Sequence, residues 1–114
     1  QQVTPDVLDY ILSLLVIRDE KVTTEGIQQL RRQIDELDNQ MMEVLSKRMR
    51  VCREIGQYKK EHNMTVFQSN RYNEILEKRG AQASVCGVDP ECAAHIFELI
   101  HQESVRQQIE IINQ

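Results

Sequence analysis

Apolar residues recur at helical spacing between residues 24 and 61. The steps between them are threes and fours, with one step of seven. The positions are Ile27, Leu30, Ile34, Leu37, Met41, Leu45, Cys52 and Ile55. A stripe with this spacing lies along one face of an α-helix and packs over its whole length. The sequence therefore predicts one long helix that begins at Thr23 or Thr24 and ends near His62.

Two cations stand on this otherwise apolar face. Arg48 follows Met41 by seven residues. Lys59 follows Ile55 by four residues, so both cations share the face of the stripe. A buried charge is costly unless a group of opposite sign meets it. The two cations therefore indicate an anionic partner inside the packed protein.

Three shorter helices are predicted around the long one. A hydroxyl, a proline and an acid at the helix start predict a helix over residues 4–17. After the long helix, Ser69 is expected to cap a helix over residues 70–79. Residues 80–88, rich in small side chains, are expected to form a loop.

The last helix has the clearest start in the chain. Asp89 and Pro90 form a cap followed by a first-turn proline, which predicts a helix over residues 90–112. Its inner stripe is Ala93, Phe97, Ile100, Ser104, Gln108 and Ile111. This face also turns polar, at Ser104 and Gln108.

The length of the long helix predicts a dimer. At the α-helical rise it spans roughly 55 Å, more than the diameter of a compact domain of this size. Two shorter helices cannot cover it, so a second copy of the chain is the simplest partner. We therefore expect an all-α fold assembled as an intertwined homodimer, with a plain coiled coil as the alternative.

Composition excludes several classes of partner. The 114 residues carry a formal net charge of −4, no tryptophan and 4% aromatic residues. Non-specific nucleic-acid binding relies on basic patches and stacking surfaces, so no nucleic acid is expected as a partner. The apolar runs are far shorter than the roughly 20 residues that span a bilayer, so no membrane partner is expected.

The three cysteines, Cys52, Cys86 and Cys92, are an odd number without a regular disulfide framework. Reduced thiols and a cytoplasmic location are therefore expected. Cys86, Cys92 and His95 match no common zinc-ligand spacing, so we expect no metal site.

Polar residues interrupt both packing faces. The long helix carries Arg48 and Lys59, and the last helix carries Ser104 and Gln108. A single buried polar residue often fixes register in a helical bundle, which is the structural alternative. Several cations with neutral hydrogen-bonding groups and few acids are typical of a pocket for a small polyanion. His101, three residues before Ser104, is expected near this pocket without a catalytic role.

Five spaced motifs resemble the all-helical (AroQ) chorismate mutases. They are residues 30–38 (LRRQIDELD), 45–48 (LSKR), 55–59 (IGQYK), 66–71 (VFQSNR) and 103–108 (ESVRQQ). The resemblance extends over about residues 27–112. It implies that residues 27–114 form a chorismate mutase domain that consists of one long helix and two shorter ones.

The resemblance also implies an activity and a set of catalytic residues. The family converts chorismate to prephenate by a Claisen rearrangement, without a cofactor or a covalent intermediate. By position, Arg48 pairs with one of the two substrate carboxylates and Arg31 with the other. These arginines are seventeen residues apart, roughly 25 Å along a helix, so Arg31 is expected to come from the partner chain. Lys59 and Gln108 are expected to hydrogen-bond the breaking ether oxygen.

Four further residues are expected to bind the substrate through the same resemblance. Gln68 and Tyr72 stand where family members often carry Asp and Glu, which position the substrate hydroxyl. Arg71 matches the family motif and is expected to orient its neighbours. Ser104 is expected to contact a carboxylate or to shape the pocket.

Residues 1–26 lie outside the resemblance, and the helix predicted there is apolar on nearly all sides. The chain also begins at Gln1 rather than at a methionine. Because family members are often fused to another enzyme of the shikimate pathway, this segment is expected to link to an N-terminal domain. DAHP synthase is the favoured one.

Three other functions remain open. A regulatory domain of a fused synthase would bind chorismate or prephenate without turnover. An isochorismate-pyruvate lyase would share the fold. A structural helical dimer would bind no such dianion, and its Arg48→Ala and Lys59→Ala variants would be as stable as the wild type or more stable.

Overall fold

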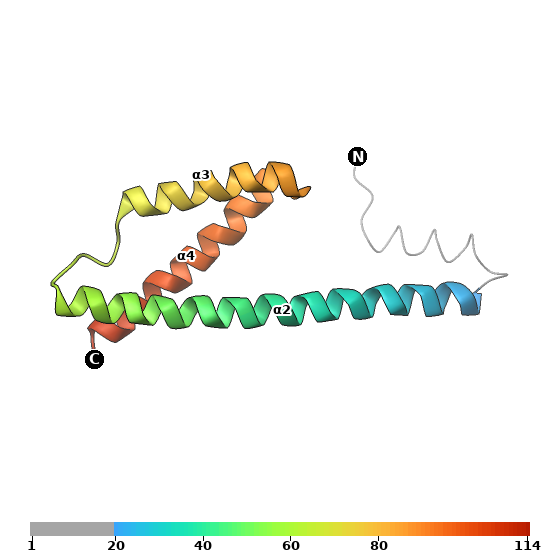
Figure 1. Ribbon diagram of the computed structural model, residues 1–114, viewed down its shortest axis with the longest axis horizontal. Coiled ribbons are helices and arrows are strands. Elements are labelled where there is room, and N and C mark those ends of the chain that lie inside the picture. The colour runs from blue at the N-terminus through green and yellow to red at the C-terminus, as the bar shows by residue number, and fades with distance from the viewer. Residues whose placement is uncertain (1–19) are drawn as a thin grey trace. The chain divides into compact units, whose positions relative to one another are not determined.

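The structure, a computed structural model, describes residues 20–114 (Figure 1). These residues form three helices and no strand: α2 (Glu20–Glu61), α3 (Ser69–Cys86) and α4 (Pro90–Ile112). The predicted all-α class, with one long helix followed by two shorter ones, is confirmed. The helix predicted over residues 4–17 lies outside the described residues.

α2 is a continuous helix of 42 residues and begins a few residues before the predicted start at Thr23 or Thr24. Its last turn carries Lys59 and Lys60, cations that interact favourably with the negative end of the helix dipole. The chain divides into two compact units, residues 1–43 and residues 44–114.

In the first unit, the apolar stripe of α2 is uncovered. Every side chain from residue 24 to residue 43 is exposed. Leu30, Ile34 and Met41 have 58%, 57% and 63% of their surface accessible. A contiguous apolar face of this kind is typical of a surface that another element or another chain covers.

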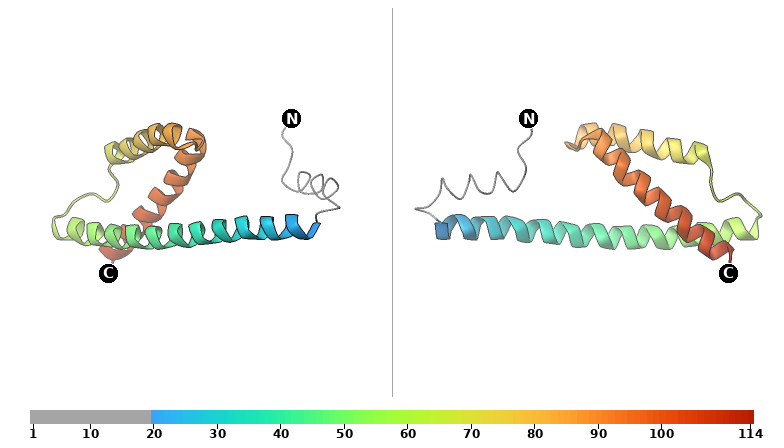
Figure 2. Two further views of the ribbon diagram at one scale, coloured as in Figure 1. Left: turned by 45° about the vertical axis from the view of Figure 1, so that its right-hand side comes forward. Right: turned by 180° about the vertical axis from the view of Figure 1, so that it is seen from behind.

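The second unit is formed by the C-terminal turns of α2 together with α3 and α4. Figures 1 and 2 show α4 running from the end of α3 back to the C-terminal turns of α2. The small apolar core of this unit consists of Met49, Cys52, Ile75, Ala83 and Ala93. The core therefore takes residues from all three helices and ties them together.

The two ends of α3 differ from the sequence prediction. Gln68, in an extended conformation, is the N-cap residue, and it makes no side-chain capping bond, so the prediction that Ser69 caps the helix is wrong. The predicted loop over residues 80–88 is also wrong, because α3 continues through Gly80 to Cys86. Ala83 is buried against the rest of the unit, and this packing outweighs the weak helix preference of Gly80.

A sharp turn joins α3 to α4. α3 ends at Gly87, which adopts a left-handed conformation (φ 78°) and donates its backbone N–H to the Ala83 carbonyl. Asp89 then caps α4 by accepting a hydrogen bond of 3.0 Å from the backbone N–H of Cys92. The predicted range of the last helix, residues 90–112, is confirmed.

α2 and α4 cross in close contact at Gly56. A Cβ atom at this position would lie 3.0 Å from the Cα of Gln108 and 3.3 Å from its carbonyl oxygen. These are backbone atoms, which cannot move aside as a flexible side chain can. The absence of a side chain at Gly56 therefore allows α4 to approach α2 closely.

We expect Gly56→Ala to destabilise the protein despite the higher helix preference of alanine. Overpacking at the crossing costs about 1–3 kcal/mol, which exceeds the roughly 0.5–1 kcal/mol that alanine normally gains over glycine in a helix. Urea denaturation followed by circular dichroism measures the free energy of unfolding. Gly80→Ala is the matched control, because no atom lies within 4 Å of a Cβ built there. An equal gain in stability for both variants would contradict the close crossing.

Candidate functional site

A cavity of about 250 Å³ lies in the second unit, where α2, α3 and α4 meet. Its polar wall consists of Arg48, Lys59, Gln68, Arg71, His101, Ser104 and Gln108. Cys52, Ile55, Ile75 and other apolar side chains complete it. A wider and more open hollow of about 620 Å³ covers the start of α3 and shares Gln68 and Arg71 with the cavity. The smaller cavity brings together most of the polar residues that the sequence predicted.

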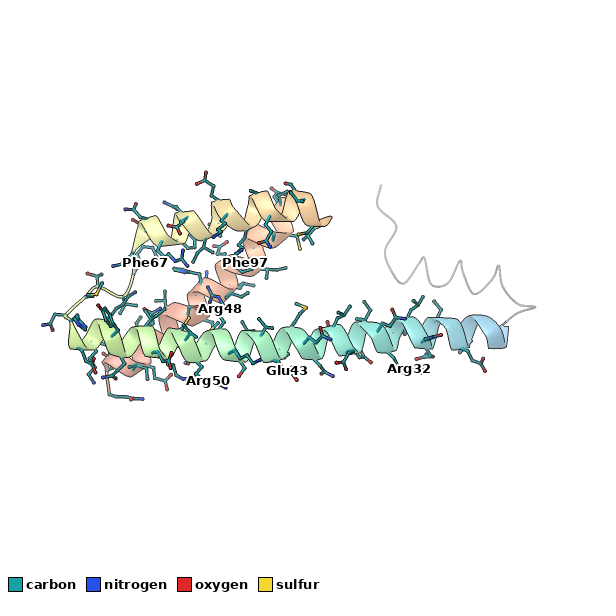
Figure 3. All side chains as sticks on the ribbon, viewed as in Figure 1. Arg32, Glu43, Arg48, Arg50, Phe67 and Phe97 are labelled. Atoms are coloured by element: carbon teal, nitrogen blue, oxygen red, sulfur yellow. The ribbon has the colours of Figure 1, made fainter. Side chains whose placement is uncertain are left out.

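Arg48 reaches from α2 to α4. Its guanidinium donates to the hydroxyl of Ser104 at 2.5 Å, and this hydroxyl donates to the Ile100 carbonyl at 2.8 Å. Ser104 is only 4% exposed. Figure 3 shows Arg48 on the side of α2 that faces α4, whereas Arg50 lies on the opposite side. The hydroxyl therefore holds Arg48 in place without neutralising its charge.

Lys59 makes the second connection between the two helices. Its ammonium donates to the side-chain oxygen of Gln108 at 2.9 Å and to the Val66 carbonyl at 2.7 Å. Burial lowers the pKa of Lys59 below its ordinary value of 10.5, and the charge interaction with Cys52 partly opposes this shift. Gln108, only 7% exposed, is a neutral partner like Ser104. Both cations are thus bound to uncharged groups.

The nearby acids pair with other residues. Glu103, next to Ser104 in sequence, accepts hydrogen bonds from Arg106 and Gln107, and these bonds lower the pKa of Glu103 to about 2. Glu74 pairs with Arg71 at 2.6 Å. Within residues 24–114, no carboxylate lines the cavity. The cavity therefore presents an excess of positive charge together with neutral hydrogen-bonding groups, which suits a small anion.

The remaining predicted residues differ in their relation to the cavity. Gln68 and Arg71 line the cavity. Tyr72 is not among the lining residues, but its ring packs 4.7 Å from that of His101, which does line the cavity. Arg31 lies in the first unit, is exposed, and is absent from the described cavity wall.

His101 is the polar residue of the cavity wall to which the sequence assigned no role. It lies one helical turn before Ser104, and that spacing was the available signal because residues i and i+3 share a helix face. Its Nε2 atom is buried and has no hydrogen-bond partner within the described part of the chain. Burial and the charges of Arg48, Lys59 and Arg71 lower the pKa of His101 below 6.5.

Within residues 20–114, no three histidine, cysteine, aspartate or glutamate side chains gather closely enough to hold a metal ion. None of the three helices described combines the length and apolar content that a bilayer crossing requires.

The chain is similar over part of its length to several known proteins, three of which follow. It is 28% identical over 75 residues to the T-protein of Enterobacter agglomerans, covering 66% of this chain and 20% of that protein. It is 26% identical over 89 residues to 4-amino-4-deoxychorismate mutase of Streptomyces pristinaespiralis (78% and 69%). It is 32% identical over 79 residues to bifunctional chorismate mutase/prephenate dehydratase of Aquifex aeolicus (67% and 22%). The chain thus spans about a fifth of the length of the first and third relatives.

The family model described as chorismate mutase type II matches residues 30–109. This match includes every residue that lines the 250 Å³ cavity. It covers more than half of the chain and ends within α4. The chain therefore belongs to the chorismate mutase type II family.

Proposed function

We propose that the chain catalyses the Claisen rearrangement of chorismate to prephenate in the biosynthesis of phenylalanine and tyrosine. The observation that carries this proposal is the cavity where Arg48 and Lys59 meet only neutral partners. Chorismate is a small dianion, so its carboxylates supply the missing opposite charge. Family membership supports the same substrate.

The reaction requires orientation and charge stabilisation. Chorismate must be held in its compact pseudo-diaxial conformer, and its ether oxygen gains negative charge as the bond breaks. In our proposal, Arg48 and Ser104 hold one carboxylate and thereby orient the substrate, while Gln68 and Arg71 act from the start of α3. Tyr72 supports the site by packing its ring against that of His101. No cofactor takes part.

Lys59 and Gln108 are the proposed partners of the ether oxygen. Their side chains already converge, 2.9 Å apart, at the α2–α4 contact. Donors held in place before the reaction stabilise developing charge without reorganisation. Gln108 is neutral at all ordinary pH values, so its amide N–H groups need no proton from solution to donate. The charge of Lys59 makes it the stronger of the two donors.

We further propose an intertwined homodimer in which Arg31 of the partner chain binds the second carboxylate. Two observations support it: the apolar stripe of residues 27–41 is exposed, and Arg31 is absent from the described wall of the cavity. A second copy of the chain would both cover the stripe and complete the site. We propose the cytoplasm as the location.

We also propose that this mutase domain works within a bifunctional protein, with DAHP synthase as the fused enzyme. Support comes from the apolar character of residues 7–15 and from the bifunctional relative of Aquifex aeolicus. Sequencing the full gene tests this proposal. A gene that encodes only these 114 residues would contradict it.

A regulatory domain that binds chorismate or prephenate without turnover is the second candidate. Tyr72 favours it, because family members often carry Glu at this position. An isochorismate-pyruvate lyase is a third candidate, which would release pyruvate from isochorismate. Loss of chorismate absorbance separates the first two candidates, since a regulatory domain binds without consuming the substrate.

The decisive experiment is a chorismate assay on the wild type and Lys59→Ala. We expect the substitution to lower kcat/KM about 10²–10³-fold, since it removes a donor to the developing charge. Lys60→Ala is the matched control, because Lys60 is exposed and donates to the Gln114 carbonyl instead. A wild type no faster than Lys59→Ala would end the catalytic assignment.

We expect activity to fall at alkaline pH as Lys59 loses its proton. Burial lowers the pKa of Lys59, so the midpoint of the fall in kcat/KM, which reports the free enzyme, should lie below 10.5. The midpoint in kcat should be higher, because a bound dianion favours the charged form. Lys60→Ala should keep this alkaline limb, and the residual activity of Lys59→Gln should lack it. A midpoint in kcat/KM at or above 10.5 would be the contrary result.

A mixing experiment tests the shared site. Arg31→Ala and Arg48→Ala homodimers should both be nearly inactive, because each lacks one carboxylate contact in both sites. A mixed dimer regains one intact site, so co-expression in equal amounts should restore about a quarter of wild-type activity. Native mass spectrometry verifies that mixed dimers form. Their formation without any recovery would argue against contribution of Arg31 by the partner chain.

A further inference from the structure

His101 is the polar group of the cavity wall that the proposed mechanism leaves unused. Two hydrogen bonds cross the α2–α4 junction, one from Arg48 to Ser104 and one from Lys59 to Gln108. The Nε2 atom of His101 is, by contrast, the one buried side-chain nitrogen or oxygen in the described region without a hydrogen-bond partner. Such a group is costly in a folded protein, and a ligand can satisfy it once the side chains that bury it move aside.

The surroundings of His101 favour its neutral form. Arg48 and Lys59 act on it from α2, and Arg71 acts on it from α3. The rings of Tyr72 and Phe67 lie 4.7 Å and 6.0 Å from the imidazole. Burial, followed by the three cations, lowers the pKa of His101, which favours the neutral imidazole. A neutral imidazole has one N–H donor and one acceptor nitrogen.

The neutral form of His101 limits the kinds of ligand group to which it can hydrogen-bond. In the proposed function, arginines bind the two carboxylates of chorismate, and Lys59 with Gln108 binds the ether oxygen. The polar group that remains is the hydroxyl on the ring. Gln68, which lines the same cavity, is a second neutral group that can reach this hydroxyl. A hydroxyl both donates and accepts, so it can bond to a neutral imidazole through either nitrogen.

An ammonium group in place of this hydroxyl would be repelled by the cations of the cavity wall. Arg48 and Lys59, which have only neutral partners, would repel it, and no carboxylate among the described lining residues would offset that repulsion. Arg71 contributes less, because Glu74 already pairs with it. The name of one relative, 4-amino-4-deoxychorismate mutase, denotes a substrate with an amine at this ring position. The two substrates therefore differ at the position where the charge of the wall matters.

We propose that His101 hydrogen-bonds the ring hydroxyl of chorismate and makes the cavity select a hydroxyl over an amine at that position. The inference rests on the proposed function, because the hydroxyl is assigned to His101 after the carboxylates and the ether oxygen of chorismate have been assigned to other residues. It adds a specificity-determining residue to the site.

The test compares chorismate with 4-amino-4-deoxychorismate in the wild type, His101→Leu and His101→Gln. The wild type should prefer chorismate. His101→Leu should lower kcat/KM for chorismate about tenfold and lower the ratio of the two kcat/KM values by a similar factor. His101→Gln keeps a neutral donor and acceptor and should stay within about threefold of the wild type. His95→Leu, an exposed histidine of the same helix, is the matched control and should change neither value.

The outcomes separate this inference from the proposed function. A wild type without turnover of chorismate would overturn both. A wild type that turns over chorismate, together with a folded His101→Leu of unchanged activity and unchanged ratio, would overturn the role of His101 alone. A structural role of His101 would lower both activities together and leave their ratio unchanged, which also counts against the inference.

A measurement on the wild type covers the case in which His101→Leu does not fold. The imidazole nitrogen signals are followed by NMR and assigned with His101→Gln. Without ligand, His101 should titrate below pH 6.5. Saturating prephenate should shift the Nε2 signal and raise the titration midpoint, because its carboxylates offset the cations. Protection from thermal unfolding shows that prephenate is bound. An Nε2 signal that does not move under these conditions would overturn the inference.

Discussion

Arg48 and Lys59 are joined to α4 through neutral acceptors, the Ser104 hydroxyl and the Gln108 amide oxygen. These hydrogen bonds position both cations while leaving their charge uncompensated. A carboxylate in either place would have satisfied the cation and closed the cavity to an anion. The remaining features serve this junction: the turn at Gly87 returns α4 to α2, and the apolar core holds the three helices around it.

The polar positions of the site could be predicted because the pattern isolates them. Arg48 and Lys59 interrupt one apolar face, Ser104 and Gln108 interrupt another, and helical spacing alone brings each pair to a shared surface. The bounds of α4 were predicted for a similar reason, since a cap and a first-turn proline are local signals. The end of α3 is not set by a local signal. Burial of Ala83, a tertiary effect, carries that helix past Gly80.

Two parts of the site depend on information that a single sequence does not contain. The importance of His101 arises from three cations and two rings on other segments, and spacing on α4 indicates only its location. The proposed part of Arg31 depends on a second chain. The exposed stripe of α2 is consistent with such a partner, yet the stripe itself does not define the register of the two chains.

The close crossing at Gly56 has a mechanical consequence. Two helices that touch backbone to backbone can rock about the contact point. Gln108 stands at this pivot and Lys59 is about one turn from it, whereas Arg48 lies roughly 12 Å along α2. A small rotation of α4 on α2 would therefore displace the contact between Arg48 and Ser104 more than the contact between Lys59 and Gln108. The end of the cavity assigned to bond breaking would stay rigid, while the carboxylate end could adjust to its ligand.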